Sequence, residues 1–415
     1  MKKILIFILL VLVSFITYRE LTRKPIIEIK EVIKEVEVIK EVEKTPEIKK
    51  EPELKDIKLI KTDFKDLANW QTDNFADAGE TFLESCHQIS HSGTEYLYNS
   101  VVKIPTDIYK ELCLKYAITP VNFKNFVEKN FTPYLVTSEG SASGKFTSYY
   151  ESRIFASYER SDRYKYPVYG KPRDLIDVRL KDFDPSLPNI TLIGRADKDN
   201  RLTKYYTRSE IYWQVLDAPI ILWADDLVDI YVMQIQGSAV AYLENGQHVR
   251  VGYAENNGHP FTGIGSILLN KGLIEPGQAS MGQIKKWLKE KGEDAIDHML
   301  ENERYIFHRI INAEGPIGAQ GVPLRAGRSI AVDRAYIPLG ALIWLETTGP
   351  NKEKIEKLVV AQDIGSAIKG PIRGDYFWGS GNDEVLDLAG KMNSSGRYFI
   401  LIPNGVKTDE NEPEI

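Results

Sequence analysis

The sequence of 415 residues contains only two cysteines, Cys86 and Cys113. So few cysteines exclude a disulfide-dense scaffold and any multi-cysteine metal cluster. A single disulfide and a pair of buried free thiols are both compatible with the sequence. The chain also lacks an excess of positive charge, because its net charge is −6 and no block of Lys or Arg stands out. Since nucleic-acid binders usually present a basic face, the composition argues against a nucleic-acid partner.

Several common catalytic motifs are missing as well. There is no G-x-S-x-G nucleophile elbow, no G-x-x-x-x-G-K-[ST] phosphate loop and no G-x-G-x-x-G dinucleotide loop. His87 and His91 have i,i+4 spacing, but the stretch HQISH lacks the glutamate of a zincin, so we expect them at the surface or at a helix cap. We therefore predict no metal and no cofactor, which leaves carboxylate chemistry.

The N-terminus has the plan of an export signal. Lys2 and Lys3 precede the apolar run Ile4–Ile16, and no small-x-small cleavage site follows it. We expect residues 1–18 to form an uncleaved signal anchor, with cleavage further downstream as the alternative. Residues 19–60 are rich in Lys, Glu, Val and Ile and repeat the motif IKEV, which predicts a charged spacer. The protein is therefore expected to be exported.

The globular part, from near Phe64 to near Pro403, has a mainly β texture. Short β-branched or aromatic runs bounded by Gly, Pro or Asn predict strands; they are FTSYYES, DIYVMQIQG, VRVGYA, YIFHRII, ALIWLET and RYFILIP. Helical signals are fewer: a capping box at Ser280–Gln283 precedes one predicted helix, and a second short helix is expected around Ile296. Many short strands favour barrels over a doubly wound α/β sheet.

Three aspartates are the candidates for the chemistry. Asp375 directly precedes Tyr376-Phe377-Trp378, neighbours that could desolvate a carboxyl group and raise its pKa, as a general acid requires. Alternate residues of a strand point to opposite faces, so the three aromatics cannot all line one pocket. Asp363 ends the apolar run KLVVAQD, and Asp333 closes the run SIAVD. Aspartates at strand ends are also common as turn residues, which is the structural alternative.

Polysaccharide cleavage fits these residues, since it typically uses Asp or Glu and needs no cofactor. Gln234 and Gln236 in MQIQGS alternate, so a strand would place both amides on one face of a sugar-binding groove. Buried structural amides are the alternative for this pair.

Long stretches of the sequence resemble the membrane-bound lytic murein transglycosylase A (MltA) family and its closing three-aspartate (3D) domain. The stretches are GKFTSYYES, DIYVMQIQGSA, VGYAENNGHPFTGIG, GPIGAQGVPLRAGRSIAVDRAYIPLGA and AQDIGSAIKGPIRGDYFWGSG. The resemblance implies a double-psi β-barrel over residues 61–152 and 273–405. A smaller, barrel-like β domain over residues 153–272 would be inserted in it, with few short helices and a tail over residues 406–415. A groove between the two domains would hold the glycan.

The resemblance also implies the roles of individual residues. Asp375 matches the single acid/base of the family, with Asp363 and Asp333 supporting it. Five residues match positions that line the groove: Thr147, Tyr149, Tyr150, Gln234 and Gln236. The implied substrate is peptidoglycan, cut between N-acetylmuramic acid and N-acetylglucosamine with formation of 1,6-anhydro ends. A glycoside hydrolase on the same fold and a non-catalytic murein-binding tether are the alternatives.

The sequence departs from the usual family pattern in a few places. Ser148 and Ser152 stand where the family reads TGYYEP, and Ile364 and Ser366 stand where it reads DTGGA. These changes remove no carboxylate, so they bear on subsite preference. No cysteine precedes Cys86, so the N-terminal segment would replace a lipid anchor. The expected location is the periplasmic side of a bacterial envelope. Partners in a wall-remodelling complex are left open.

Overall fold

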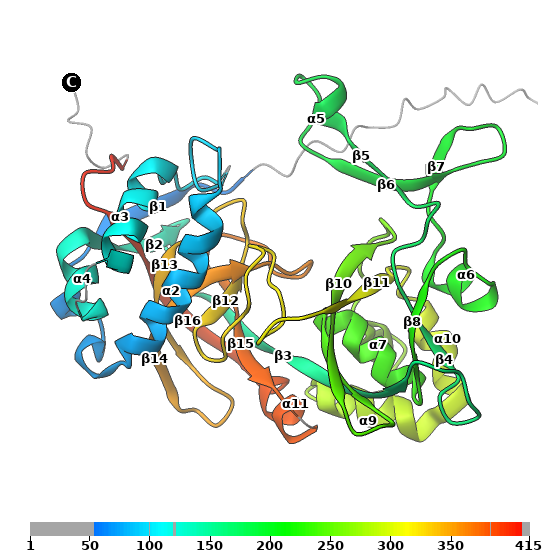
Figure 1. Ribbon diagram of the computed structural model, residues 1–415. Helices are drawn as coiled ribbons and strands as arrows, with labels where there is room; N and C mark the ends of the chain where they lie inside the picture. Colours follow the sequence, from blue (N-terminus) through cyan, green and yellow to red (C-terminus); the bar gives the residue numbers. More distant parts are fainter. Residues whose placement is uncertain (1–53, 99, 119–121, 382, 409–415) are drawn as a thin grey trace, which may run out of the picture. The chain divides into compact units, whose positions relative to one another are not determined.

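The computed structural model describes residues 54–98, 100–118, 122–381 and 383–408, which form a mainly β structure with few helices (Figure 1). The strands are β1 (Ile57–Lys61), β2 (Phe131–Ser138), β3 (Gly144–Ser157), β4 (Tyr166–Tyr169), β5 (Ile176–Arg179), β6 (Thr191–Ala196), β7 (Leu202–Lys204), β8 (Ile220–Ala224), β9 (Ala239–Leu243), β10 (His248–Asn256), β11 (Ile306–Ile311), β12 (Ser329–Val332), β13 (Leu342–Thr348), β14 (Lys354–Asp363), β15 (Arg373–Ser380) and β16 (Asn393–Pro403). The helices are α2 (Phe75–Ser90), α3 (Thr106–Ile118), α4 (Phe123–Asn130), α5 (Leu180–Phe183), α6 (Arg208–Trp213), α7 (Leu227–Gln236), α8 (Ile264–Asn270), α9 (Met281–Lys291), α10 (Ile296–Leu300) and α11 (Asp383–Ala389).

Part of the largest sheet closes on itself. Its strands run in the order β16, β13, β14, β12, β15, β3, and β3 pairs back with β16 through residues 144–147 and 393–396. A closed ring removes the free edges that an open sheet would expose. The apolar side chains of this ring, among them Trp344 and Tyr398, belong to a first hydrophobic core.

Helices α2, α3 and α4 pack on this first core, and we did not predict them from the sequence. The signal was nevertheless present in α2. Asn74 caps its N-terminus by accepting a hydrogen bond from the Ala76 backbone N–H at 3.3 Å. Phe75, Phe82, Cys86 and Ile89 then recur at the spacing of one helical face, and all four are buried.

Cys86 and Cys113 form a disulfide that joins α2 to α3. The choice that the sequence left open between a disulfide and free thiols is thereby decided. The bridge closes a loop with a sequence separation of 27 residues. A loop of that length stabilises a fold by about 3–4 kcal/mol in the chain-entropy account.

We expect the double variant Cys86→Ser/Cys113→Ser to lose about 2–4 kcal/mol of unfolding free energy, because its unfolded chain regains the loop entropy. Urea unfolding of both proteins under oxidising conditions measures the loss as a lower midpoint. A reductant should lower the midpoint of the wild type and leave that of the double variant unchanged. Equal midpoints in the two proteins would contradict the stabilising role of the bridge.

A second set of hydrophobic clusters is built from residues between 154 and 307. Strand β3 connects it to the first core, because residues 152–156 of β3 pair with β9 while residues 145–151 pair with β15. The packing of the second set continues past the predicted boundary at residue 272. Helices α9 and α10 pack with α7 and α8, and β11 pairs with β10, so residues 273–311 belong with this second set.

The run DIYVMQIQG is a helix and not the strand that its β-branched residues predicted. Asp226 caps α7 by accepting hydrogen bonds from the Val228 and Asp229 backbone N–H groups at 2.8 and 3.1 Å. Gly237 ends the helix with a φ of 92°, a conformation that favours glycine. The helix is buried around most of its circumference, so it lacks the polar face that would have identified it.

Several other predicted elements are confirmed. VRVGYA, YIFHRII, ALIWLET and RYFILIP lie in strands β10, β11, β13 and β16, and the capping box of Ser280 and Gln283 begins α9. Residues 57–60, assigned to the spacer, instead belong to β1, which pairs with β2. The predicted anchor, residues 1–18, lies outside the described residues. Within the described residues, the helices are too short or too polar to cross a membrane.

Candidate active site

Asp363 and Asp375 flank the same short strand. Asp363 is the last residue of β14, whereas Asp375 lies within β15 and not at a strand end. Strand β12 runs between them, and Ala331 of β12 is in register with Asp363 on one side and with Asp375 on the other. The closed sheet therefore brings together two carboxylates that are twelve positions apart in the sequence.

Strand β3 supplies a hydroxyl group to each carboxylate. It runs parallel to β15, with Thr147 opposite Asp375 and Tyr149 opposite Phe377. The Thr147 hydroxyl donates a hydrogen bond to Asp375 Oδ1, and the Tyr149 hydroxyl donates to Asp363 Oδ2 at 2.8 Å. Because residues i and i+2 of a strand share a face, both donors point to the same side of the sheet.

The aromatic run after Asp375 divides between the two faces, as the sequence predicted. Phe377 is buried on the side of the carboxylates, where its ring lies 5.1 Å from that of Tyr149. Tyr376 points the other way, into the first core, and its hydroxyl donates to the Gly327 carbonyl at 3.1 Å. One residue of the three therefore contributes an apolar wall to the site.

Burial shifts the protonation of both carboxyl groups. Loss of solvent and, to a smaller extent, the negative charge of Asp375 raise the pKa of Asp363 to about 6, against hydrogen bonds that lower it. Burial also raises the pKa of Asp375, although the Thr147 hydroxyl and the Arg373 guanidinium both act to lower it. The pair can therefore hold a proton closer to neutral pH than ordinary aspartates do.

The two carboxylates differ in how many of their oxygens are engaged. Asp363 accepts at both oxygens, from Tyr149 at Oδ2 and from the Ala319 backbone N–H at Oδ1, 2.9 Å away. Asp375 accepts from Thr147 at Oδ1, and within the described residues its Oδ2 receives no hydrogen bond. Asp375 thus retains an oxygen that can reach a ligand.

Comparisons with known proteins identify the family of this chain. The model of the MltA specific insert domain matches residues 145–309, and the model of the 3D domain matches residues 328–402. A crystal structure of MltA from Neisseria gonorrhoeae is 31% identical, with a TM-score of 0.73, and the match covers 85% of this chain and 97% of that chain. This chain belongs to the MltA family.

Curated sequences of the MltA family extend the match. The membrane-bound lytic murein transglycosylase A homolog of Buchnera aphidicola is 29% identical over 74% of this chain and 78% of that protein. Membrane-bound lytic murein transglycosylase A of Escherichia coli is 30% identical over 62% of this chain and 65% of that protein. The chain thus spans somewhat less than two thirds of the length of the E. coli relative.

The third aspartate of the 3D domain, Asp333, does not contact the other two. It directly follows β12, as predicted, and is buried. Its Oδ2 accepts a hydrogen bond from the Gly370 backbone N–H at 2.9 Å, and its Oδ1 accepts from the Ala335 backbone N–H at 3.2 Å. Asp333 therefore fixes the loop that leads from β14 into β15, the strand that carries Asp375.

Three of the five predicted groove residues are placed differently from the expectation. Gln234 and Gln236 do not share a face, because they lie two positions apart on helix α7. The Gln234 side chain accepts a hydrogen bond from the Arg208 guanidinium. Gln236 Oε1 instead accepts from the Tyr150 backbone N–H at 3.2 Å. Tyr150 is 3% exposed and packs with Leu386 and Ala389 of α11, on the opposite face of β3 from Tyr149. Thr147 and Tyr149 are the two that meet the carboxylates.

The structure also identifies residues that sequence reasoning missed. Arg373 donates to the Thr147 hydroxyl at 2.7 Å, so it orients the hydroxyl that contacts Asp375. Gln362 is fully buried, and its side-chain amide donates to the Ser85 hydroxyl of α2 at 2.8 Å. Its backbone carbonyl accepts from the Gln320 backbone N–H at 3.0 Å. These hydrogen bonds fix the end of β14 at the residue that directly precedes Asp363. The sequence gave no signal for Arg373 or Gln362, because their hydrogen-bond partners Thr147 and Ser85 come from distant segments.

Two of the departures from the family pattern face away from the carboxylates. The Ser148 hydroxyl donates to the Ala389 carbonyl at 2.8 Å, and the Ser152 hydroxyl donates to the Ser238 carbonyl at 2.9 Å. Both serines therefore attach β3 to neighbouring segments. Within the described residues, no group of three His, Cys, Asp or Glu side chains could hold a metal ion.

The raised pKa of Asp363 predicts a specific pH dependence of stability. Because the folded state keeps this proton to about pH 6 and the usual pKa is 3.8, its contribution to stability falls as the pH rises through that interval and is constant above it. Asp363→Asn cannot ionise and lacks this loss. As the pH rises from 4 to 6.5, we expect the unfolding free energy of the variant to increase by about 1–2 kcal/mol relative to that of the wild type, a value reduced for solvent screening.

Urea unfolding at several pH values measures this difference. Asp217→Asn serves as the control, because the Asp217 side chain is 67% exposed in an ion pair with Arg173. A stability difference between Asp363→Asn and the wild type that does not change with pH would contradict the raised pKa.

Proposed function

We propose that this protein is a peptidoglycan lytic transglycosylase. It would cleave the β-1,4 bond between N-acetylmuramic acid and N-acetylglucosamine and leave 1,6-anhydromuramic ends. Support comes from membership of the MltA family, whose curated relatives are named lytic murein transglycosylases, and from the desolvated carboxylate pair. Because this reaction consumes no water, a carboxyl group able to hold a proton suffices.

The open oxygen of Asp375 is the observation on which the assignment of the acid/base rests. Each oxygen of Asp363 already accepts a hydrogen bond, from Tyr149 or from Ala319, whereas Asp375 Oδ2 accepts none within the described residues. A general acid must come within hydrogen-bond reach of the leaving oxygen. Asp375 is therefore the proton donor in our proposal, and Asp363 supports it.

In the proposed mechanism, Asp375 protonates the glycosidic oxygen as the C1–O bond breaks through an oxocarbenium-like state. The resulting carboxylate then accepts the proton of the muramic C6 hydroxyl, whose oxygen bonds to C1 of the same ring. Proton donation and proton return balance, so the enzyme is regenerated. No second nucleophilic carboxylate is needed, unlike in ordinary retaining hydrolases. Positioning of the C6 hydroxyl is the remaining requirement.

We infer that the closed ring of β3, β12, β13, β14, β15 and β16 is a double-psi β-barrel and that the second set of clusters is a domain inserted in it. A glycan groove between them, with Thr147 and Tyr149 on the barrel side, would complete the site. We also propose that the protein acts on the periplasmic side of the envelope and is held there by its N-terminal segment. The Cys86–Cys113 disulfide supports an oxidising compartment.

Mass spectrometry of the products from purified sacculi tests the proposal. Anhydro-muropeptides, which lack one water relative to hydrolysed ends, are the expected products. Reducing ends would refute the transglycosylase, and sacculus binding without any product would instead favour the non-catalytic tether.

A hydrolase is the second candidate, because one observation favours it. A carboxyl group with a pKa of about 6, as for Asp363, is suited to act as a general base that activates water. Asp363→Asn separates the candidates. In a transglycosylase the substitution removes a negative charge beside Asp375, so cleavage persists and the alkaline limb of its pH–rate profile moves to lower pH. In a hydrolase the substitution removes the general base and abolishes cleavage.

A further inference from the structure

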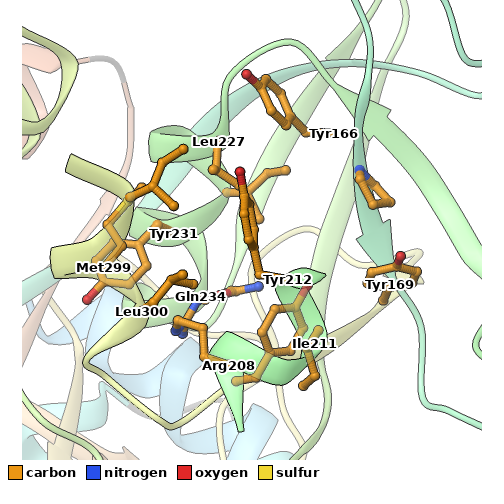
Figure 2. A pocket seen from close by; sticks show the side chains of 14 residues that line it. Tyr166, Tyr169, Arg208, Ile211, Tyr212, Leu227, Tyr231, Gln234, Met299 and Leu300 are labelled. Carbon is orange, nitrogen blue, oxygen red and sulfur yellow. Dashed lines mark hydrogen bonds between the residues drawn. The ribbon is translucent and has the colours of Figure 1, made fainter. Parts of the chain in front are cut away.

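A pocket of about 120 Å³ lies within the second set of clusters, among β4, α6, α7 and α10 (Figure 2). None of its lining residues contacts Asp363 or Asp375. Its walls are apolar and aromatic, with Ile230 and Met299 among the aliphatic residues and five tyrosine rings: Tyr166, Tyr169, Tyr212, Tyr231 and Tyr305. An engineered apolar cavity of about 150 Å³ accommodates benzene, so the space here suits a single ring or a short aliphatic chain.

One charged side chain, Arg208, lines this pocket, and it is only 6% exposed. Figure 2 shows it beside Gln234. Its guanidinium donates to the Asn302 carbonyl at 2.9 Å, to Gln234 Oε1 and to the Arg304 carbonyl. It also lies 4.7 Å from the ring centroid of Tyr231 and 5.2 Å from that of Tyr305. All of these partners are uncharged.

The carboxylates that neighbour Arg208 or its partner Asn302 in the sequence are engaged elsewhere. Glu210 accepts from Thr207 at the cap of α6, Glu301 pairs with Lys271 at 2.6 Å, and Glu303 lies 3.4 Å from His259. Within the described residues, Arg208 therefore forms no ion pair. A buried charge is costly unless an opposite charge accompanies it. Neutral acceptors and two aromatic faces reduce that cost without neutralising the charge.

The guanidinium also has donors to spare. It carries five N–H groups, and the three hydrogen bonds use three of them, which leaves two on the terminal nitrogens. A guanidinium binds carboxylates and phosphates with two parallel hydrogen bonds. The carboxylate is the smaller of the two and carries a single charge, which suits a small pocket lined by one cation. The tyrosine and aliphatic walls would receive an apolar group attached to it.

We propose that this pocket binds a small carboxylate that carries an apolar group about the size of one ring. The carboxylate pairs with Arg208, and the apolar group lies among the tyrosines. Such a carboxylate belongs either to a free acid or to the C-terminus of a peptide. The proposal is independent of the carboxylate pair and of the reaction proposed for it.

Isothermal titration calorimetry on the full-length protein tests this proposal with two matched pairs of probes. Sodium benzoate is compared with benzamide, and N-acetyl-alanyl-alanine with its C-terminal amide. Each pair has the same shape and differs in charge. We expect at least one acid to bind about tenfold or more tightly than its amide, because a charged hydrogen-bond partner is lost in the amide. Preference for benzoate identifies a free acid, and preference for the dipeptide identifies a peptide terminus.

Variants then locate the binding. Arg208→Gln should remove the preference for the acid, whereas Arg195→Gln should keep it, since Arg195 stacks on the Tyr206 ring at 4.3 Å and does not line the pocket. If Arg208→Gln fails to fold, Leu300→Trp fills the pocket with Arg208 intact and should abolish binding. Equal affinity for acid and amide in both pairs, no saturable heat up to the solubility limit, or acid binding that survives Leu300→Trp would overturn the proposal.

Discussion

We expect Asp375→Asn to lower the rate of glycan cleavage about 10²–10⁴-fold, the contribution of a positioned general acid/base. The amide is isosteric, and its oxygen can still accept from the Thr147 hydroxyl as Asp375 Oδ1 does. The fold and sacculus binding should therefore persist while the proton that protonates the leaving oxygen is absent. Release of soluble muropeptides from sacculi, followed over time by mass spectrometry, measures the loss.

Asp333→Asn is the matched control for this experiment. It changes an aspartate of the same domain whose carboxylate contacts the Gly370 and Ala335 backbone and neither member of the pair. We expect a much smaller loss of activity in Asp333→Asn. Cleavage at the wild-type rate by Asp375→Asn would refute the assignment of the acid/base, and a larger loss in Asp333→Asn would place the chemistry elsewhere.

Glu151→Ala should cost about 3–5 kcal/mol of unfolding free energy, which is a large part of the total for a domain. Glu151 is fully buried at the point where β3 passes from the closed ring to the second set of clusters. Its Oε1 pairs with Arg250 Nε of β10 at 2.8 Å, and its Oε2 accepts from the Ser380 hydroxyl of β15. Removing the carboxylate leaves the mostly buried Arg250 without its counter-charge.

Urea unfolding with a two-state test measures this cost. Asp217→Ala is the control, because the ion pair between Arg173 and Asp217 is solvent-exposed on both sides, and we expect little or no change there. Equal losses in Glu151→Ala and Asp217→Ala would show that the buried pair does not stabilise the junction.

Patterns with a local physical cause were predicted correctly. The alternation of Tyr376 and Phe377 between two faces follows from the period of a strand, and the helix after Ser280 follows from its capping box. Asp333 and Asp363 were placed at the ends of strands because each closes an apolar run. The helix α7 was misjudged, because a run buried on nearly all sides has neither a two-residue nor a 3.6-residue alternation.

The sequence by itself determined the mainly β texture and the family, and it singled out Asp375, which precedes an aromatic run, as the candidate acid/base. Tertiary structure alone decided which groups meet. Thr147 and Asp375 are 228 positions apart, and Tyr149 and Asp363 are 214 positions apart, yet closure of the ring joins each pair by a hydrogen bond. The disulfide, the hydrogen bonds of Gln234 and Gln236 to distant residues and the burial of Tyr150 depend on the same long-range packing. Backbone periodicity acts over a few residues, whereas pairing of distant strands depends on the whole closed sheet.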